Sequence, residues 1–239
     1  MSNYYDYENE EKSYGLSTTF STLMRNVYAW MSGGLLITAL IAFMVSNNES
    51  IIRAIFGNSI LMWGLLIGEV IVVMILSGRI HKMSFSTAGF LFVLYSALNG
   101  ITLSVIFLAY TMESIASVFF ITAGTFAVMS FLGYTTKKNL STMGRILYML
   151  LIGVVIATIV NIFLHSSGLA LILNYVGVVI FVGLTAYDTQ KIKNMLLQCN
   201  EEEVSEQSSK LALLGSLTLY LDFINLFLYL LRFLGNRRD

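Results

Sequence analysis

Seven apolar segments, each close to the length that crosses a lipid bilayer, limit what this chain can fold into. They cover residues 26–46, 60–78, 86–110, 114–134, 145–165, 169–190 and 211–234. A helix of about 20 apolar residues spans the hydrocarbon core of a membrane. Backbone polar groups in lipid must find partners within the segment, which favours helices, and a barrel would need shorter alternating strands. The sequence therefore predicts an all-α integral membrane protein with seven transmembrane helices.

The composition agrees with this fold class and excludes several others. Charged residues make up 12% of the chain, about half of what soluble domains carry, and the mean hydropathy is +0.76. The formal net charge is zero, so nothing in it indicates a nucleic-acid partner. The single cysteine, Cys199, cannot form an internal disulfide. The chain contains no proline to bend a helix, so we expect uninterrupted helices.

The chain divides into a polar, acidic tail at residues 1–25 and a seven-helix membrane domain at residues 26–239. The tail has neither the basic start nor the short apolar core of a secretory signal peptide. The connections that carry more lysine and arginine lie on the cytoplasmic side. With the N-terminus inside, the inner basic residues are Lys12, Arg25, Arg79, Lys82, Lys137, Lys138, Arg145, Lys191, Lys193 and Lys210, and the outer ones are Arg53, Arg232, Arg237 and Arg238. This bias predicts a cytoplasmic N-terminus. The basic C-terminus is discordant with it, and the conflict would disappear if the last segment were re-entrant or shielded within the helix bundle.

Two aspartates lie in the last two apolar segments, Asp188 in AYDTQ and Asp222 in LYLDFINLF. In an antiparallel helix pair, residues at equal depth have numbers that average to the position of the turn. The mean of the residue numbers 188 and 222 is 205, and Ser205 lies in the only long polar stretch between the two aspartates. The carboxyl groups are therefore predicted to lie level with each other, although Asp188 could also be a helix-end residue beside Lys191. Ionisable residues inside membrane helices are costly and mark ion pathways, proton relays or catalytic sites.

Two carboxyl groups that meet in a low-dielectric site share a proton rather than both ionising, which makes a pH-sensitive latch. Their oxygens also suit a hard cation, and because calcium takes about 6–8 oxygen ligands, Asp188 and Asp222 should form a weak calcium site.

Glu69, inside the second segment, is either a hydrogen-bonding group that fixes packing or part of a pathway. Asn225, on the same helix face as Asp222, is a second candidate pathway residue. Arg79, at the inner end of the second segment, is a candidate latch for the pair.

Four stretches carry a family resemblance: ALNGITLS at 97–104, GYTTKKNLS at 133–141, AYDTQKIK at 186–193 and LYLDFINLFLYLLRFLG at 219–235. They resemble the bacterial branch of the Bax inhibitor-1 family, and the likeness runs from the first apolar segment to Gly235. The resemblance implies a seven-helix fold with the last helix at the centre, surrounded by the other six. It also implies a pH-sensitive calcium leak across the bacterial inner membrane.

The resemblance further assigns roles to individual residues. Asp188 and Asp222 match the aspartates that form a hydrogen-bonded proton sensor in the family. An arginine at the end of the second helix latches the closed state there; Arg79 is the best match, followed by Lys82. Asn139 departs from the family pattern, because an acidic residue often stands at that position. No cofactor is implied. The expected partners are the lipid bilayer, protons and calcium as the transported or weakly bound ion, and no protein partner is identified.

Two other functions remain open from the sequence. Intramembrane aspartyl proteases also place two aspartates on consecutive helices, where the carboxyl groups activate water. That class needs a Gly-x-Gly-Asp loop and a Pro-Ala-Leu motif, whereas here Leu219, Tyr220 and Leu221 precede Asp222 and proline is absent. The third interpretation is a regulatory membrane scaffold without transport. A retinal-type receptor is excluded because the last segment has no interior lysine. We expect the protein not to be an enzyme.

Overall fold

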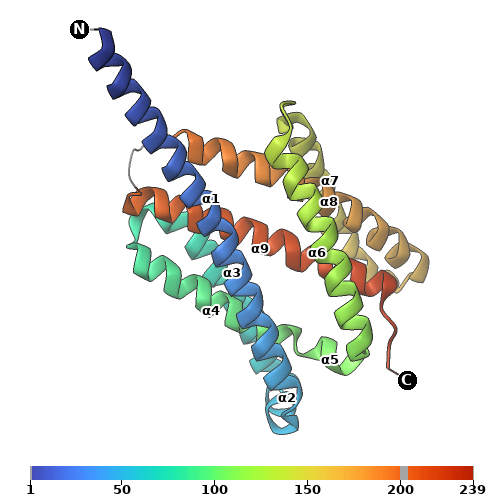
Figure 1. Cartoon of the computed structure of the whole chain (residues 1–239). Helices are drawn as coiled ribbons and strands as arrows, with labels where there is room; N and C mark the ends of the chain where they lie inside the picture. The colour runs from blue at the N-terminus through green and yellow to red at the C-terminus, as the bar shows by residue number, and fades with distance from the viewer. Residues whose placement is uncertain (1, 200–203, 239) are drawn as a thin grey trace. The chain divides into compact units, whose positions relative to one another are not determined.

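The computed structural model describes residues 2–199 and 204–238, with side chains from residue 15 onward. The described chain is helical, and within it no strand forms beyond one isolated antiparallel bridge between Tyr110 and Arg237. The elements, shown in Figure 1, are α1 (Ser2–Ser46), α2 (Glu49–Phe56), α3 (Ser59–Arg79), η1 (Ile80–Lys82), α4 (Phe85–Leu103), α5 (Val105–Ala109), α6 (Met112–Thr135), α7 (Ser141–Leu164), α8 (Ser167–Leu197) and α9 (Glu206–Leu234).

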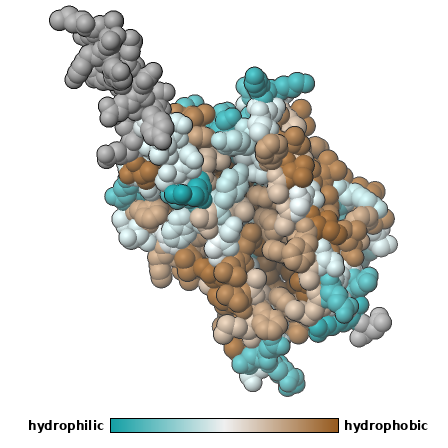
Figure 2. All heavy atoms as spheres, in the orientation of Figure 1, coloured by the Kyte–Doolittle hydropathy of each residue, from teal (hydrophilic) through white to brown (hydrophobic). Residues whose placement is uncertain are grey.

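Within the described residues, seven helical stretches are long and apolar enough to cross a membrane, which confirms the predicted fold class. They are Gly15–Ser46, Ser59–Lys82, Phe85–Ala109, Met112–Thr135, Ser141–Leu164, Ser167–Leu197 and Glu206–Leu234. Figure 2 shows hydrophobic side chains over much of the visible surface and hydrophilic ones gathered near helix ends. The apolar window of α9 has the largest buried share, 61%. This burial agrees with a central last helix, an arrangement that stays a prediction.

Several bounds differ from those predicted. Helix α1 begins at Ser2, not near residue 26, so the first apolar segment is the C-terminal part of a longer helix. The third segment is not one uninterrupted helix. The backbone N–H and hydroxyl of Ser104 both donate to the carbonyl of Ile101, at 3.2 and 2.6 Å, which breaks the regular four-residue pattern and ends α4. The turn predicted around Ser205 includes residues 200–203, which lie outside the described residues.

The chain forms two compact units. The first comprises Met1–Ser104 and Ile192–Leu217, and the second comprises Val105–Lys191 and Thr218–Asp239. In the first unit, α1 lies along α4 and α3 packs on α4 (Figure 1).

The packing of α1 on α4 combines a hydrogen bond, a close backbone approach and aromatic contacts. The Thr38 hydroxyl donates to the carbonyl of Ser96 at 2.8 Å, and Gly100 lets α4 approach the backbone of Thr38. The Trp30 ring meets Phe92 edge to face, with centroids 5.8 Å apart. Small residues at such crossings let membrane helices pack closely.

The second unit is held by glycines that face the backbone or ring of a neighbouring helix. Gly133 of α6 lies against the backbone of Ala186 on α8, and a Cβ atom at Gly133 would overlap the Ala186 carbonyl. Gly177 of α8 lies against the ring of Tyr229 on α9. Both approaches bring α8 close enough to its neighbours for short side chains to reach across.

The C-terminal tail is tied to the connection between α5 and α6, within the second unit. Asn236 accepts from the N–H of Thr111 at 3.2 Å and donates its own N–H to the Ser114 hydroxyl at 2.8 Å, and the N–H of Arg238 donates to the Ala109 carbonyl at 3.0 Å. This connection follows the third span, and the tail follows the seventh. The bonds therefore hold the tail at the same end of the second unit as the connection that follows the third span. A re-entrant last segment would return the tail to the other side, so these bonds favour a complete crossing by α9.

Candidate functional site: a buried aspartate pair

Asp188 lies on α8 and Asp222 on α9, and the two side chains belong to the same compact unit. Both are buried, with 0% and 5% of their surface exposed. The charge of Asp188 acts on Asp222, and the charge of Lys191, one turn further along α8, acts on both. Two carboxyl groups on consecutive helices are thus buried within electrostatic reach of each other.

The segment that carries Asp188 is clamped on two sides. All five residues of AYDTQ contact α6, α7 or the connection between these helices. The partners are Gly133 for Ala186, Gly144 for Tyr187, Tyr148 for Asp188, Ser130 for Thr189, and Lys138 with Leu140 for Gln190. Helix α8 continues to Leu197, so Asp188 is an interior helix residue and not a helix end.

Gln190 fixes the connection between α6 and α7. Its side-chain amide donates to the carbonyl of Lys138 at 2.8 Å and accepts from the N–H of Leu140 at 2.8 Å. Gln190 lies on the same turn of α8 as Asp188, so this turn carries the carboxyl group and also holds the α6–α7 connection with its two lysines. Glutamine can make both bonds because its amide has a donor and an acceptor, which match one carbonyl and one N–H group of the turn.

Asp188 has one hydrogen-bond donor from a neighbouring helix. The hydroxyl of Tyr148 on α7 lies 3.0 Å from Oδ2 and 3.2 Å from Oδ1 of Asp188. Tyr148 itself is 38% exposed, so its ring reaches the surface while its hydroxyl points to the carboxylate. Tyr148 is not among the residues predicted from the sequence, because a tyrosine in an apolar segment is ordinary and α7 has no polar face to mark its inner side.

Asp222 is almost fully buried on α9, with 5% of its surface exposed. Its neighbour Phe223 packs against Phe119 and Phe126 of α6, with ring centroids 5.6 and 5.5 Å apart. Among the residues that the structure describes, Oδ2 of Asp222 is buried without a hydrogen-bond partner. A buried polar atom without a partner is costly, and more so when the group is charged. The surroundings of Asp222 therefore suit a neutral carboxyl group better than an ionised one.

The site has few ligands for a metal ion. No cluster of three or more histidine, cysteine, aspartate or glutamate side chains occurs in the described part of the chain. Asp188 and Asp222 offer four carboxylate oxygens, and Tyr148 adds a hydroxyl oxygen beside Asp188. Calcium takes about 6–8 oxygens, so any ion at this pair would keep part of its hydration shell. The donor set fits transient, weak binding and does not fit a tight structural site.

Glu69 belongs to a separate polar cluster in the first unit. The hydroxyl of Thr102 on α4 donates to Glu69 Oε1 on α3. Tyr95 lies within electrostatic reach of Glu69, and the side-chain amide of Asn99 donates to the Tyr95 hydroxyl at 3.2 Å. The cluster joins α3 to α4 inside their membrane spans. Glu69 is half-buried and hydrogen-bonded, which agrees with a packing role and leaves the pathway role a prediction.

The remaining predicted residues occupy helix surfaces and ends. Asn225 donates its amide to the carbonyl of Leu221 at 2.8 Å, within its own helix. Arg79 and Lys82 are exposed at the end of α3 and in η1, in the unit that does not contain the aspartates, and the latch role stays a prediction. Asn139 accepts from the N–H of Ser141 at 2.8 Å and so satisfies a free donor at the start of α7.

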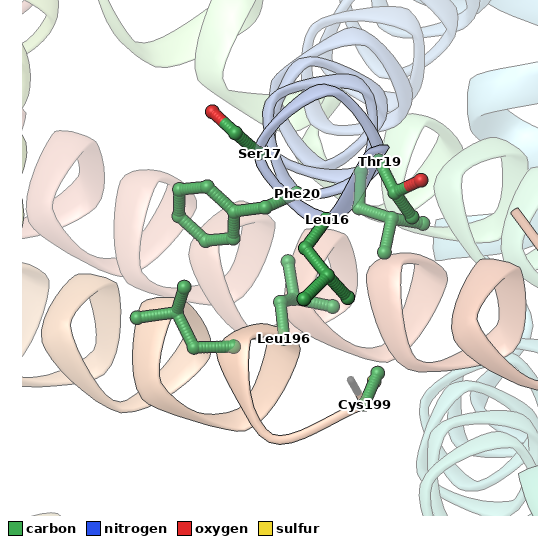
Figure 3. Close-up of a pocket in the computed structure, with 8 residues that line it drawn as sticks. Leu16, Ser17, Thr19, Phe20, Leu196 and Cys199 are labelled. Atoms are coloured by element: carbon green, nitrogen blue, oxygen red, sulfur yellow. The ribbon is translucent and has the colours of Figure 1, made fainter. Parts of the chain in front are cut away.

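A pocket of about 300 Å³ lies elsewhere, in the first unit. Figure 3 shows Leu16 and Phe20 of α1 facing Leu196 of α8 and the nearby Cys199. The lining is mostly apolar, and none of the predicted site residues contributes to it. The lining of this pocket has no charged group that could bind an ion. The aspartate pair does offer such groups, and it is therefore the candidate functional site.

Comparison with known proteins gives a consistent result. The sequence model of the family described as "Inhibitor of apoptosis-promoting Bax1" matches residues 20–239. The inner membrane protein YbhL of Escherichia coli K12 is 51% identical, over 91% of this chain and 92% of that protein. An uncharacterized protein of Borreliella burgdorferi is 49% identical over 90% and 92%, and an uncharacterized membrane protein of Streptococcus pyogenes serotype M6 is 34% identical over 87% and 90%.

Proposed function

Because this chain belongs to the Bax inhibitor-1 family, we propose that it is a multi-pass protein of the bacterial inner membrane that leaks calcium in a pH-dependent way. The relative in Escherichia coli is named an inner membrane protein, and seven helices here are suited to span a bilayer. The N-terminus lies in the cytoplasm, in keeping with the distribution of lysine and arginine.

One observation carries the proposal: Asp188 and Asp222, on consecutive membrane helices, are both buried and act on each other electrostatically. Two carboxyl groups in such a site share a proton, since ionising both would place like charges in a low-dielectric medium. With one proton bound, the pair holds α8 against α9. A change in that proton count alters the contact between the helices and opens a polar path for ions.

The permeant ion in this mechanism is a hard cation. Carboxylate oxygens suit calcium, and the small number of ligands keeps binding weak, so that an ion can leave as well as enter. Glu69, held by Thr102 within the membrane span of α3, is the candidate further carboxyl group on the path. Arg79 is the candidate cation that latches the closed state.

Calcium flux into dye-loaded proteoliposomes tests the proposal. The wild-type protein, Asp188→Asn and Asp222→Asn are compared at about pH 6 and about pH 8, which brackets the range expected for a coupled carboxyl pair. Glu49→Gln is the matched control, because Glu49 is 76% exposed and its ion pair in the described structure is with Arg53 on the same short helix α2. We expect the wild type and the control to share a pH-dependent flux that either aspartate variant abolishes or makes insensitive to pH.

The same experiment separates the other functions. A wild-type flux no greater than that of empty liposomes at either pH would contradict the leak and leave a membrane scaffold. An intramembrane protease would instead cleave a membrane peptide, and both asparagine variants would abolish the cleavage. We accordingly propose that the protein conducts ions and does not catalyse a reaction.

A further inference from the structure

Four basic side chains gather at one end of the second unit, where α6 ends and α7 begins. They come from three elements of that unit: the connection between α6 and α7, the start of α7, and α8. All four are exposed. None of them forms an ion pair with another residue in the part of the chain that the structure describes. This basic cluster consists of Lys137, Lys138, Arg145 and Lys191.

Gln190 holds the lysines of the connection against α8. Its side-chain amide donates to the carbonyl of Lys138 and accepts from the N–H of Leu140, each at 2.8 Å. Lys191 follows Gln190 directly on α8, so its cation belongs to the same end of the unit. The connection is therefore fixed by hydrogen bonds next to a further cation. A fixed group of cations loses less freedom when it binds an anion than a mobile group does.

Arg145 is placed by the contact between α7 and α8. Gly144, the preceding residue, lies so close to the ring of Tyr187 on α8 that a Cβ atom at Gly144 would overlap that ring. The guanidinium of Arg145 donates to the Thr142 hydroxyl, at 3.4 Å, on the first turn of α7. The arginine is therefore held at the same end of the unit as the lysines. Its guanidinium has further N–H donors, whose planar arrangement suits an anion such as phosphate.

The acidic residues of the second unit do not neutralise the basic cluster. Among the described residues they are Glu113, Asp188 and Asp222. Glu113 lies on the first turn of α6, at the opposite end of this 24-residue helix from the connection. Asp188 and Asp222 are buried, and Lys191 acts on both of them. The other three cations therefore present positive charge that no described acidic group of the unit offsets.

The basic cluster lies at the level of the lipid headgroups. The connection, residues 136–140, joins the spans Met112–Thr135 and Ser141–Leu164, so it lies where the chain leaves the hydrocarbon core and returns to it. Tyr134, at the end of the first of these spans, is 37% exposed, as is common for tyrosines at the boundary between membrane and water. The anion of this layer is lipid phosphate, and basic groups between membrane helices bind anionic lipid headgroups.

We propose that the basic cluster is a binding site for an anionic phospholipid, whose phosphate groups contact the cations of the connection, α7 and α8 together. Arginine and lysine both form charge-assisted hydrogen bonds with phosphate oxygens. A headgroup bound there joins the ends of three membrane helices. The site is separate from the aspartate pair, and its occupation does not depend on ion transport.

Cardiolipin, which carries two phosphates, is the probe, and native mass spectrometry follows its binding to the purified full-length protein in detergent. One variant combines Lys137→Gln, Lys138→Gln and Arg145→Gln. These changes leave the backbone bond from Gln190 in place. Each basic residue contributes about fivefold to the affinity for an anionic lipid, so we expect a loss of about a hundredfold in this variant and about fivefold in Lys191→Gln. Phosphatidylcholine should bind equally to the wild type and the variants.

The matched control combines Arg232→Gln, Arg237→Gln and Arg238→Gln. It removes the same number of exposed charges at the end of the unit where the tail bonds to Ala109 and Thr111, before α6. Its affinity for cardiolipin should equal that of the wild type, and all three proteins should share one melting temperature without lipid, so that a loss of binding is not a loss of folding.

Two results would overturn the inference. Equal losses of affinity in the two triple variants would show attraction by net charge alone. An unchanged affinity in the variant of the basic cluster would leave these residues only a role in membrane orientation. Inorganic phosphate is the competitor that separates the two sources of the anion. Displacement of cardiolipin by an equal concentration of inorganic phosphate would contradict a lipid site and assign the cluster to a free anion.

Discussion

Gly133 and Ala186 lie in contact across α6 and α8, so closely that a Cβ atom on Gly133 would overlap the carbonyl of Ala186. Ala186 precedes Asp188 by two residues, so this contact fixes the height and distance of the aspartate relative to α6. We expect Gly133→Ala to force the helices apart and to destabilise the protein by about 1–3 kcal/mol, as overpacking does in other cores. Thermal unfolding in detergent measures the change.

The control for this substitution is Gly124→Ala on the same helix. A Cβ atom at Gly124 meets nothing within 4 Å. Alanine there should be neutral or stabilise the protein by about 0.5–1 kcal/mol, because it reduces backbone freedom in the unfolded chain. Equal melting temperatures for the two alanine variants would show that the contact between Gly133 and Ala186 is not tight.

Gln190 should protect the loop that it clamps. Gln190→Ala removes both hydrogen bonds to Lys138 and Leu140, each with a net contribution of about 1 kcal/mol. We expect trypsin to cleave after Lys137 or Lys138 about thirtyfold faster, since the two bonds together contribute about 2 kcal/mol and each 1.4 kcal/mol changes the open population about tenfold. Gln198→Ala, at an exposed position just after the end of α8, is the control and should leave the cleavage rate unchanged. No change in Gln190→Ala would mean that the loop is held by other contacts.

The C-terminal tail should be accessible from outside the cell. Its backbone bonds to Ala109 and Thr111 place it with the connection that follows the third span. In a Cys199→Ser background, Arg237→Cys should react with a membrane-impermeant maleimide on intact cells. Cys199 itself, in the otherwise unchanged chain, should react only after lysis. The reverse pattern would show the opposite orientation, and labelling of both only after lysis would show that α9 does not cross.

The seven spans could be predicted from sequence because apolar length alone decides them. The chemistry of the last two segments also stands out in the sequence, since Asp222 is the only charge between Lys210 and Arg232. Asp188 and Asp222 are equally far along the chain from the turn predicted at Ser205, which predicts that they lie at the same depth. In the structure both are buried, within electrostatic reach of each other. This prediction requires only that the two helices form a hairpin, because equal numbers of residues then lead from the turn to each aspartate.

The surroundings of the pair could not be predicted in the same way. Tyr148 and Gln190 reach their partners because α7 and the α6–α7 connection have a particular rotation and height beside α8. A helix that is apolar on all sides carries no polar stripe from which that rotation can be deduced. The break at Ser104 was also missed, because a serine that bonds to the carbonyl three residues earlier looks like any other serine in a sequence.

Glu69 should affect conduction and not the pH response. Glu69→Gln keeps an acceptor for the Thr102 hydroxyl and removes the charge, so packing of α3 on α4 is retained. If the path passes this residue, calcium flux falls severalfold while its pH midpoint stays that of the wild type, because a lost charge weakens cation entry. A shifted midpoint with undiminished flux would instead make Glu69 part of the sensor.

The most direct test of the aspartate pair as one proton-sharing gate is a double-mutant cycle on calcium flux. The pH dependence of flux, taken as the ratio between about pH 6 and about pH 8, is measured for the wild type, Asp188→Asn, Asp222→Asn and the double variant. Residues that act as one unit are not additive. If the two aspartates act as one gate, the double variant is no more altered than either single variant. Independent, multiplying effects of the two substitutions would contradict it.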